Sequence, residues 1–209
     1  LEERLEVLRK VEAVVKPDTV ITSNTATMMI SDLAIALEHP ERLLGMHFIS
    51  PVSRINLVEV VSHFHTNEAS FLTVKKFAGM IGKKVIKINE SPGNISTRMI
   101  VAIINEACDI LTEGVASVAE VDEVMMEVTG NTVGPFEMAD RYGVDKIHKW
   151  MQNLYHEFGE LKYKPSPIIS RMVRAKMFGM RVGEGFYKWD GNMKSIKTGS
   201  IKNLGRDMF

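Results

Sequence analysis

The chain has 209 residues, of which 45% are hydrophobic and 25% are charged, so it can form one large core or two small ones and is typical of neither a disordered segment nor a membrane span. Its 26 basic residues balance its 26 acidic ones, which excludes nucleic acid or an anionic membrane surface as the expected partner. The single cysteine, Cys108, cannot form an internal disulfide and favours a buried thiol in a reducing, cytoplasmic setting.

The first ninety residues predict an α/β domain in which helices and strands alternate. An amphipathic helix over residues 1–16 precedes a buried strand over 19–24, a short helix over 28–37 and a strand over 43–49. A strand over 55–61, a helix over 68–81 and a strand over 83–88 follow. The turn at 51–54 is too short for a parallel crossover, so the strands on either side of it should be antiparallel.

A domain boundary is expected near residue 91, where the sequence Ser91-Pro92-Gly93 ends the alternation. Beyond it, helices are predicted over 95–111, 118–128, 136–158 and 167–178, with a capping box formed by Ser117 and Glu120. We therefore expect an α/β domain over 1–90, an all-α domain over 91–189, and a polar tail over 190–209 that is loosely held or packs on a partner.

One histidine and one carboxylate lie on the two strands that should pair. His47 is near the end of the strand over 43–49, and Glu59 is inside the next strand. Histidine is the side chain best suited to move a proton near neutral pH, and a neighbouring carboxylate can fix its tautomer and stabilise its charged form. The short reversal between the strands can return Glu59 toward His47. Taken alone, however, a histidine in an apolar strand is more often a core residue.

Separated sequence blocks occur in an order that is typical of one family. They are TSNTAT (22–27), GMHFISPVSRINLVEV (45–60), SPGNISTR (91–98), and GPFEMADRYGVD (134–145) with GEGFYKW (183–189). With them the chain resembles the L-3-hydroxyacyl-CoA dehydrogenases from its first helix to about residue 189. The resemblance implies a partial Rossmann-like domain followed by a helical domain that dimerises and helps to enclose acyl-CoA. It also implies that His47 takes the proton of the substrate 3-hydroxyl group and that Glu59 orients His47.

The dinucleotide-binding motif G-x-G-x-x-G of this family does not occur in the 209 residues. In such domains the motif lies in the first βαβ unit, where backbone amides bind the pyrophosphate of NAD and a later residue contacts the ribose. We expect that unit to lie upstream of Leu1. The isolated chain should then bind NAD weakly or not at all and transfer no hydride by itself, an expectation that micromolar affinity for NADH would contradict.

Several positions implied in binding depart from the family pattern. Ala26 stands where a serine is expected to bond to the substrate oxygen, with Thr27 beside it as an alternative donor. Ser50 replaces an asparagine near the nicotinamide, and Thr97 replaces an asparagine that polarises the substrate carbonyl. Each lost charge-stabilising hydrogen bond can lower the rate roughly 10²–10³-fold. We therefore expect Ala26, Thr27 and Thr97 at the substrate, with either altered preference or impaired catalysis.

The cofactor should be contacted by Asn24, by Ser50 and by Arg181, which occupies the place of a family lysine. A basic residue on a loop is equally well explained as solvated. His63 and His65 form an H-x-H on a loop before a helix, but they have no third ligand, so we expect solvent-exposed histidines and no metal site.

Two classes of function remain open at this point. The first is an NAD-dependent 3-hydroxyacyl-CoA dehydrogenase of fatty-acid oxidation that forms a homodimer through its helical domain; a relative that acts on a hydroxy acid without CoA belongs to the same class. The second is a non-catalytic module for acyl-CoA binding or dimerisation that is derived from the same fold. His47 with Glu59 favours the first class, and Ala26 with Thr97 favours the second.

Overall fold

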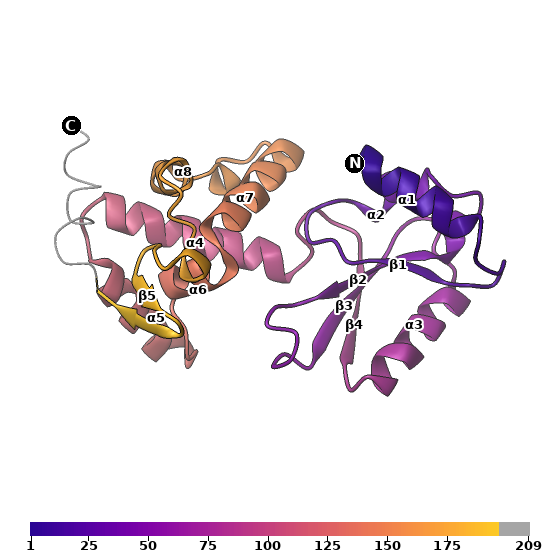
Figure 1. The fold of residues 1–209 in the computed structure, drawn as a ribbon, viewed down its shortest axis with the longest axis horizontal. Coiled ribbons are helices and arrows are strands. Elements are labelled where there is room, and N and C mark those ends of the chain that lie inside the picture. The colour runs from indigo at the N-terminus through magenta and orange to yellow at the C-terminus, as the bar shows by residue number, and fades with distance from the viewer. Residues whose placement is uncertain (197–209) are drawn as a thin grey trace. The chain divides into compact units, whose positions relative to one another are not determined.

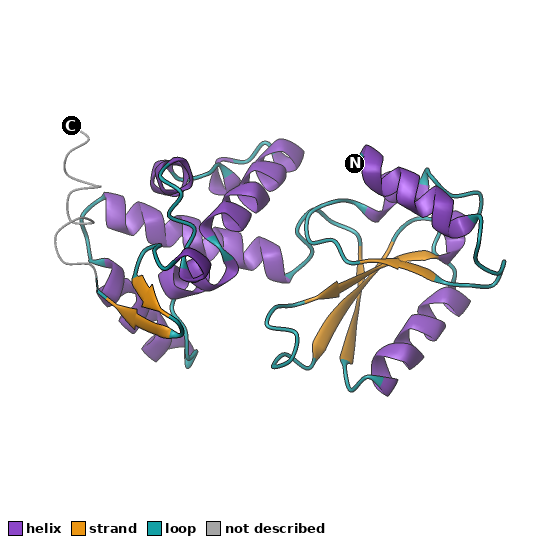
Figure 2. Ribbon diagram, viewed as in Figure 1, coloured by secondary structure: helices purple, strands orange, loops and turns teal. Residues whose placement is uncertain are grey.

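The computed structural model describes residues 1–196 of the chain and divides it into two compact units. The first unit comprises Leu1–Ser96 and the second begins at Thr97 (Figure 1). The first unit combines a sheet with helices, whereas the second is built mainly from helices (Figure 2). An α/β part followed by a helical part is the fold class that the sequence predicts.

The first unit contains a four-stranded mixed sheet with the strand order β1-β2-β3-β4. Strands β2 and β3 are antiparallel, which confirms the prediction made from the short turn between them, and the two outer pairs are parallel. The elements in chain order are α1 Glu2–Glu12, β1 Ile21–Ser23, α2 Ile30–Ala34, the 3-10 turn η1 Pro40–Arg42, β2 Leu43–Phe48, β3 Leu57–Ser62, α3 Glu68–Met80 and β4 Lys84–Asn89.

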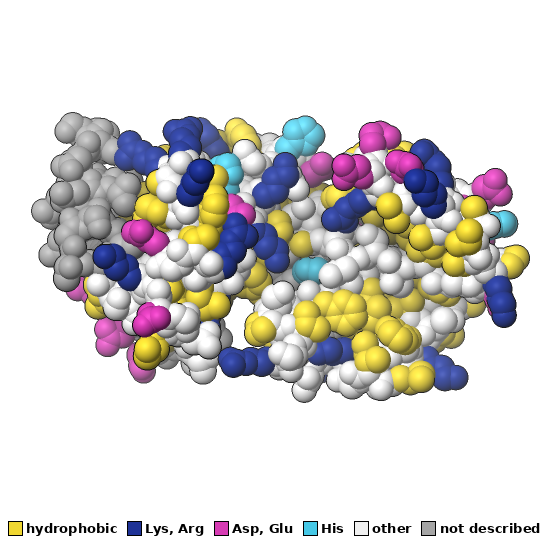
Figure 3. All heavy atoms as spheres, viewed as in Figure 1, with side chains coloured by type: hydrophobic (Ala, Val, Ile, Leu, Met, Phe, Trp, Pro, Cys, Tyr) yellow, Lys and Arg dark blue, Asp and Glu magenta, His cyan; other side chains and the backbone are white. Residues whose placement is uncertain are grey.

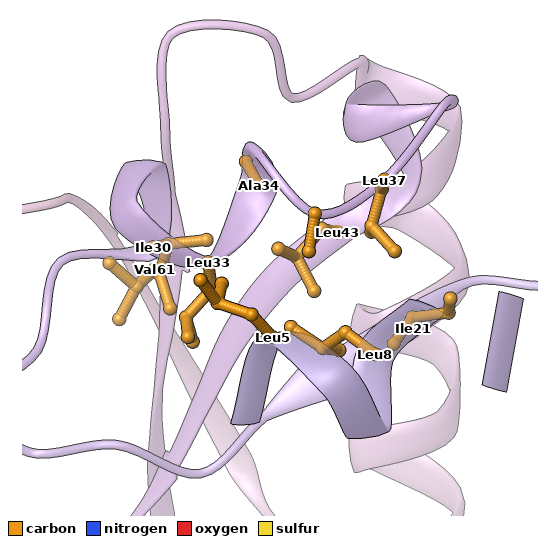
Figure 4. Packing of buried hydrophobic residues seen from close by; sticks show 10 residues of the cluster. Leu5, Leu8, Ile21, Ile30, Leu33, Ala34, Leu37, Leu43 and Val61 are labelled. Atoms are coloured by element: carbon orange, nitrogen blue, oxygen red, sulfur yellow. The ribbon is translucent and has the colours of Figure 1, made fainter. Parts of the chain in front are cut away.

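Hydrophobic side chains cover both faces of this sheet, because successive residues of a strand point to opposite sides. Leu43 of β2 and Val61 of β3 pack with α1 and α2 in one cluster, to which Leu5, Leu8, Ile30 and Leu33 also belong (Figure 4). On the other face, the neighbouring Leu44 packs with Val58 and Val60 of β3 and with Phe71, Val74 and Ala78 of α3. Both faces of β2 and β3 are therefore buried, as expected for central strands.

Helix α1 ends at Glu12, earlier than the predicted residue 16, and Glu12 and the segment after it are bound by a buried arginine. The guanidinium group of Arg42 lies 2.8 Å from the Glu12 carboxylate and also donates to the carbonyl oxygens of Lys16 and Pro17. These contacts hold the segment that follows α1. Helix α2 is likewise shorter than the predicted 28–37.

The second unit contains five α-helices among the described residues. They are α4 Ser96–Thr112, α5 Val118–Thr129, α6 Pro135–Tyr142, α7 Val144–Phe158 and α8 Pro167–Arg174, with 3-10 turns η2 Leu161–Tyr163 and η3 Met180–Val182 and short strands β5 Lys188–Asp190 and β6 Met193–Ser195. The predicted capping box is present, because Ser117 and Glu120 bond to each other's backbone N–H. The single helix predicted over 136–158 is wrong: Gly143, with φ of 100°, separates α6 from α7.

Two buried aspartates join the glycine-containing segments of this unit. Asp122 accepts hydrogen bonds from the backbone N–H of Phe136 and Glu137 and from the hydroxyl of Tyr187. Asp140 accepts from the backbone of Phe186 and Tyr187 and from the Trp189 indole, at 2.8–2.9 Å. A Cβ atom on Gly185 would lie 1.9 Å from the Asp140 carboxylate, so that contact requires glycine.

The polar tail predicted from residue 190 begins too early, because β5 and β6 form an antiparallel hairpin that reaches Ser195. Lys194 of β6 forms an ion pair with Glu137 of α6 and lies over the ring of Tyr187. These contacts hold the hairpin against the helices, so residues 190–195 are not a loosely held tail. The rest of the predicted tail, residues 197–209, lies outside the described residues.

The surface of the first unit carries exposed apolar side chains on α3. Leu72, Phe77 and Met80 are each more than half exposed. The largest gathering of hydrophobic side chains on this unit in Figure 3 lies beside α3, in the region of β3 and β4. None of the helices in residues 1–196 is both long enough and apolar enough to cross a membrane.

Candidate active site

The structure brings His47 and Glu59 together, as the sequence predicts. They are directly paired residues of the antiparallel strands β2 and β3, so their side chains leave the sheet on the same face. His47 Nδ1 lies 2.7 Å from Glu59 Oε2. The Glu59 side chain is 3% exposed and the His47 side chain 10% exposed, so the pair is almost removed from water.

Glu59 is held by a third residue, Ser96, at the start of α4. The backbone N–H of Ser96 donates to Glu59 Oε1 at 2.9 Å, and the Ser96 hydroxyl donates to Glu59 Oε2 at 3.1 Å. Burial by itself raises the pKa of Glu59, but the hydrogen bonds and charge of His47 and the two Ser96 donors outweigh burial and hold the pKa below its usual 4.5. Glu59 is therefore an ionised carboxylate near neutral pH.

The ionised Glu59 decides which nitrogen of His47 carries the proton. A carboxylate only accepts hydrogen bonds, so His47 Nδ1 must be the donor in their 2.7 Å contact. The lone pair of neutral His47 is then on Nε2, which can accept a proton from a substrate. Once it has done so, the negative charge of Glu59 stabilises the imidazolium that forms. The pair thus has the arrangement of a general base with its orienting carboxylate.

The strand that carries His47 is positioned by close packing at Gly45. A Cβ atom at this position would lie 2.7 Å from the Cβ of Val61, closer than real Cβ atoms approach, and 3.0 Å from Ile30 Cδ1, which is a tight contact. Glycine therefore allows helix α2 to approach β2 two residues before His47. The loop after β1 is tied to the same strand, because Asn24 Oδ1 accepts a hydrogen bond from the backbone N–H of Phe48 at 3.2 Å.

The other residues predicted near the substrate and cofactor differ in their surroundings. Asn24 and Ser50 are exposed and follow the ends of β1 and β2, while Ala26 is half-buried and Thr27 is buried. The neighbouring Thr25 is buried as well, and its hydroxyl accepts a hydrogen bond from the backbone N–H of Met28, which closes the loop. Their roles in binding stay predictions.

Thr97 and Arg181 belong to the second unit. Thr97 is 1% exposed and directly follows Ser96, the residue that bonds to Glu59. Arg181, on η3, forms a 2.8 Å ion pair with Asp145 and lies over the ring of Phe178. About half of its side chain remains exposed, and its contact with the cofactor stays a prediction.

The expectation for the H-x-H pair is wrong for His63 and holds for His65. His63 is 6% exposed and its Nε2 contacts the carbonyl oxygen of Pro40 at 3.0 Å, whereas His65 is exposed. His63 is thus a buried core residue whose Nε2 is hydrogen-bonded and whose Nδ1 has no partner among the described residues. Among residues 1–196, no three side chains of His, Cys, Asp or Glu are arranged to hold a metal ion.

Sequence reasoning missed Ser96, which completes the hydrogen bonding of the dyad. A serine shortly after a Pro-Gly turn is a known signal for the start of a helix, and Ser96 is the first residue of α4. That signal could have identified Ser96 as a residue with a structural role. It could not have identified Glu59 as its partner, because 37 positions separate the two residues in the chain.

The carboxyl ends of β1 and β2 form the part of the chain that can hold a dinucleotide. The two strands are parallel, and ligands of open α/β sheets bind at the carboxyl ends of such strands. The polar side chains of Asn24 and Ser50 are exposed just beyond these ends, where a dinucleotide would lie. The motif G-x-G-x-x-G, whose backbone binds a pyrophosphate, does not occur in the 209 residues.

The class of protein that the structure defines has a mixed α/β unit with a buried histidine–carboxylate dyad, followed by a helical unit. Two family models match it: "3-hydroxyacyl-CoA dehydrogenase, NAD binding domain" over residues 1–91 and "3-hydroxyacyl-CoA dehydrogenase, C-terminal domain" over residues 93–189. The chain belongs to the 3-hydroxyacyl-CoA dehydrogenase family.

Individual relatives agree with this assignment. The chain is 36% identical over 185 residues to a 3-hydroxybutyryl-CoA dehydrogenase of Clostridioides difficile, a match that covers 88% of this chain and 66% of that protein. Its structure is similar to those of (S)-3-hydroxybutyryl-CoA dehydrogenase PaaH1 from Ralstonia eutropha (TM-score 0.86, 33% identity) and of Mycobacterium tuberculosis FadB2 (TM-score 0.87, 31% identity). These matches cover 91% and 90% of this chain and 67% of each solved chain. The chain thus spans about two thirds of the length of its relatives.

Proposed function

We propose that this chain supplies the acid–base site of an NAD-dependent dehydrogenase that oxidises L-3-hydroxyacyl-CoA to 3-ketoacyl-CoA in fatty-acid metabolism. The observation that carries the proposal is the 2.7 Å contact between His47 Nδ1 and Glu59 Oε2, which leaves Nε2 as a base at the end of β2. Membership of the family supports the substrate class. The relatives named above include 3-hydroxybutyryl-CoA dehydrogenases, so a short acyl chain is the first substrate to test.

In the proposed reaction, His47 Nε2 takes the proton of the substrate 3-hydroxyl group. Bound NAD supplies the acceptor for the hydride that leaves C3. Glu59 holds the Nδ1 proton throughout and stabilises the positive charge that His47 gains. For reduction of the ketone, His47 begins protonated and returns the proton to the oxygen. Thr27 and Thr97 are proposed to contact the substrate, and Asn24, Ser50 and Arg181 to contact the cofactor.

The test is a comparison of His47→Gln with wild type in the full-length gene product, assayed with acetoacetyl-CoA and NADH. We expect kcat to fall about 10²–10⁴-fold, the contribution of a general acid or base. His65→Gln is the matched control, because His65 is exposed and lies outside the site. Equal rates for His47→Gln and the control would exclude His47 as the base and with it the proposed function.

The departures at Ala26 and Thr97 favour a second candidate, a module that keeps the acyl-CoA cleft and the dimer interface without turnover. Ala26→Ser distinguishes the two candidates. If a serine hydroxyl at this position stabilises the reacting oxygen, turnover should rise by up to roughly 10²-fold. Acyl-CoA binding without turnover in both wild type and Ala26→Ser would instead support the non-catalytic module.

A homodimer formed through the helical unit is also part of the proposal, as is a cytoplasmic location. Met99 on α4 and Val124 and Val128 on α5 are between 59% and 77% exposed, and we propose that they contribute apolar surface to this interface. The single, buried, unpaired Cys108 agrees with a reducing compartment. Sedimentation of the full-length protein tests the dimer: Val124→Glu with Val128→Glu should dissociate it, and an unchanged sedimentation coefficient would contradict this interface.

A further inference from the structure

Ser96 is the residue that completes the hydrogen bonding of the dyad, and three observations define its position. It is the last residue of the first unit and the first residue of α4. Its backbone and its side chain both donate to Glu59, one to each carboxylate oxygen. The oxygen that accepts from the Ser96 hydroxyl, Oε2, is the same one that accepts from His47 Nδ1.

The two donors on Oε2 compete for the same negative charge. A carboxylate oxygen that already accepts one hydrogen bond is a weaker acceptor for a second, because each donor withdraws electron density from it. The Ser96 hydroxyl therefore makes Glu59 less basic toward His47 than it would be with the backbone donor alone. Glu59 stabilises the imidazolium less as a result, and neutral His47, the form that accepts a proton, is favoured.

We propose that Ser96 is a positioning residue whose hydroxyl fixes the Glu59 carboxylate and sets the pH at which His47 changes from base to acid. This inference rests on the proposed dehydrogenase function and adds to it a residue that acts through Glu59. The backbone N–H of Ser96 anchors the carboxylate whatever the side chain is, whereas the hydroxyl adjusts its strength as an acceptor.

Other charged residues on the flanking elements do not take over this role, because each is bound elsewhere. The charge that acts on Glu59 is that of His47. The charged side chains nearby in sequence on α4, at the end of β4 and within β4 have their own partners: Arg98 bonds to Tyr163, Glu90 to Ser31 and Lys87 to Glu68. The Ser96 hydroxyl is thus the neutral donor through which this carboxylate can be tuned.

The substitutions that test the proposal are Ser96→Val and Ser96→Thr in the full-length gene product. Valine and threonine have nearly the same shape, and both keep the backbone N–H, so the pair differs in the hydroxyl alone. Both are assayed for kcat/KM against pH in the two directions of the reaction.

With Ser96→Val we expect the acidic limb of the oxidation profile and the alkaline limb of the reduction profile to move together to higher pH, by about half a unit to one unit. Both limbs move because the same imidazole must be neutral for oxidation and protonated for reduction. Ser96→Thr should reproduce the wild-type limbs. A role for Ser96 in folding alone would lower both rates without moving either limb, and coincident limbs for the two variants would overturn the proposal.

A spectroscopic readout separates this inference from the proposed function. The Nδ1–H proton of His47 should resonate further downfield in Ser96→Val than in Ser96→Thr, because its hydrogen bond to Glu59 becomes stronger. This signal requires no turnover. If the resonance moves but His47→Gln retains activity, the proposed function fails and the effect of Ser96 on Glu59 stands. If His47→Gln is inactive but neither the resonance nor the limbs of the pH profiles move, only the role of Ser96 fails.

Discussion

Replacing Glu59 by glutamine removes the charge from the dyad while changing its shape very little. Glu59 accepts three hydrogen bonds: one from His47 Nδ1, one from the Ser96 backbone and one from the Ser96 hydroxyl. A glutamine has one acceptor oxygen, and its amide nitrogen only donates. If the amide oxygen takes the place of Oε2, the amide nitrogen meets the Ser96 N–H, which lies 2.9 Å from that position in the wild type.

The opposite orientation of the glutamine amide places its nitrogen against His47 Nδ1. His47 must then accept at Nδ1 and carry its proton on Nε2, where the base needs a lone pair. The first orientation leaves the buried Ser96 N–H without an acceptor, at a cost of about 1–3 kcal/mol in the free energy of unfolding, and the second places the His47 proton on the wrong nitrogen. Neither orientation supplies a charge to stabilise the imidazolium. We therefore expect kcat/KM to fall about 10²–10⁴-fold, or roughly 3–5 kcal/mol of transition-state stabilisation.

The assay compares Glu59→Gln with Glu3→Gln in the full-length gene product, where Glu3 is exposed and outside the site. Kinetics with acetoacetyl-CoA and NADH give the loss of rate, and urea denaturation gives the loss of stability. The loss of transition-state stabilisation should exceed the loss in the free energy of unfolding. A folded Glu59→Gln protein that keeps kcat/KM within about threefold of the control would refute the role assigned to the carboxylate.

Three further predictions concern buried groups away from the dyad. Gly185→Ala should destabilise the second unit by about 3 kcal/mol or more, because the new Cβ would lie 1.9 Å from Asp140. The control Gly79→Ala, which has no atom near its Cβ position, should be neutral or slightly stabilising. Equal midpoints of urea denaturation for the two variants would contradict the contact between Gly185 and Asp140. Burial raises the pKa of Glu12, but the hydrogen bonds from Arg42 and two backbone amides outweigh burial and hold the pKa below its usual 4.5. The stability that Glu12 contributes is therefore complete above pH 4.5 and is lost as the pH falls through the lowered pKa. Wild type should therefore lose more stability than Glu12→Gln between about pH 7 and pH 3, and parallel losses would show that Glu12 contributes nothing. Burial raises the pKa of the Cys108 thiol to about 12, so it should not react with a thiol reagent at about pH 8 until the chain is denatured, and rapid labelling of the native protein would show that the site opens.

Local rules predict the part of the site that depends on neighbouring strands. The turn between β2 and β3 is short, which requires an antiparallel pair, and in such a pair the positions of His47 and Glu59 lie opposite each other. The ends of helices are predicted less well where the backbone angle of a single residue determines whether the helix continues. Periodicity continues from α6 into α7, yet Gly143 adopts a positive φ that no apolar pattern reveals.

Contacts between distant segments are the ones that sequence reasoning does not predict. His63 is buried because its Nε2 meets the Pro40 carbonyl, 23 positions away, and the pattern H-x-H contains no information about that partner. The strand at 193–195 follows from a turn at Gly191, a residue with positive φ, and from the ion pair between Lys194 and Glu137. In each case the deciding interaction is made by residues that no local pattern connects.

A purely structural role of the His47–Glu59 pair and a catalytic role predict different effects of substitution, because Glu59 also stabilises the structure. Its carboxylate accepts the first backbone N–H of α4, where a negative charge favours the helix. This structural role alone would retain Glu59 in a decayed enzyme, but it does not need His47, because neither Ser96 contact is made through His47. If the dyad is structural, Glu59→Gln destabilises the protein and His47→Gln changes neither stability nor rate. If the dyad is catalytic, His47→Gln abolishes turnover at nearly unchanged stability, so it is the His47 variant that measures the chemistry alone.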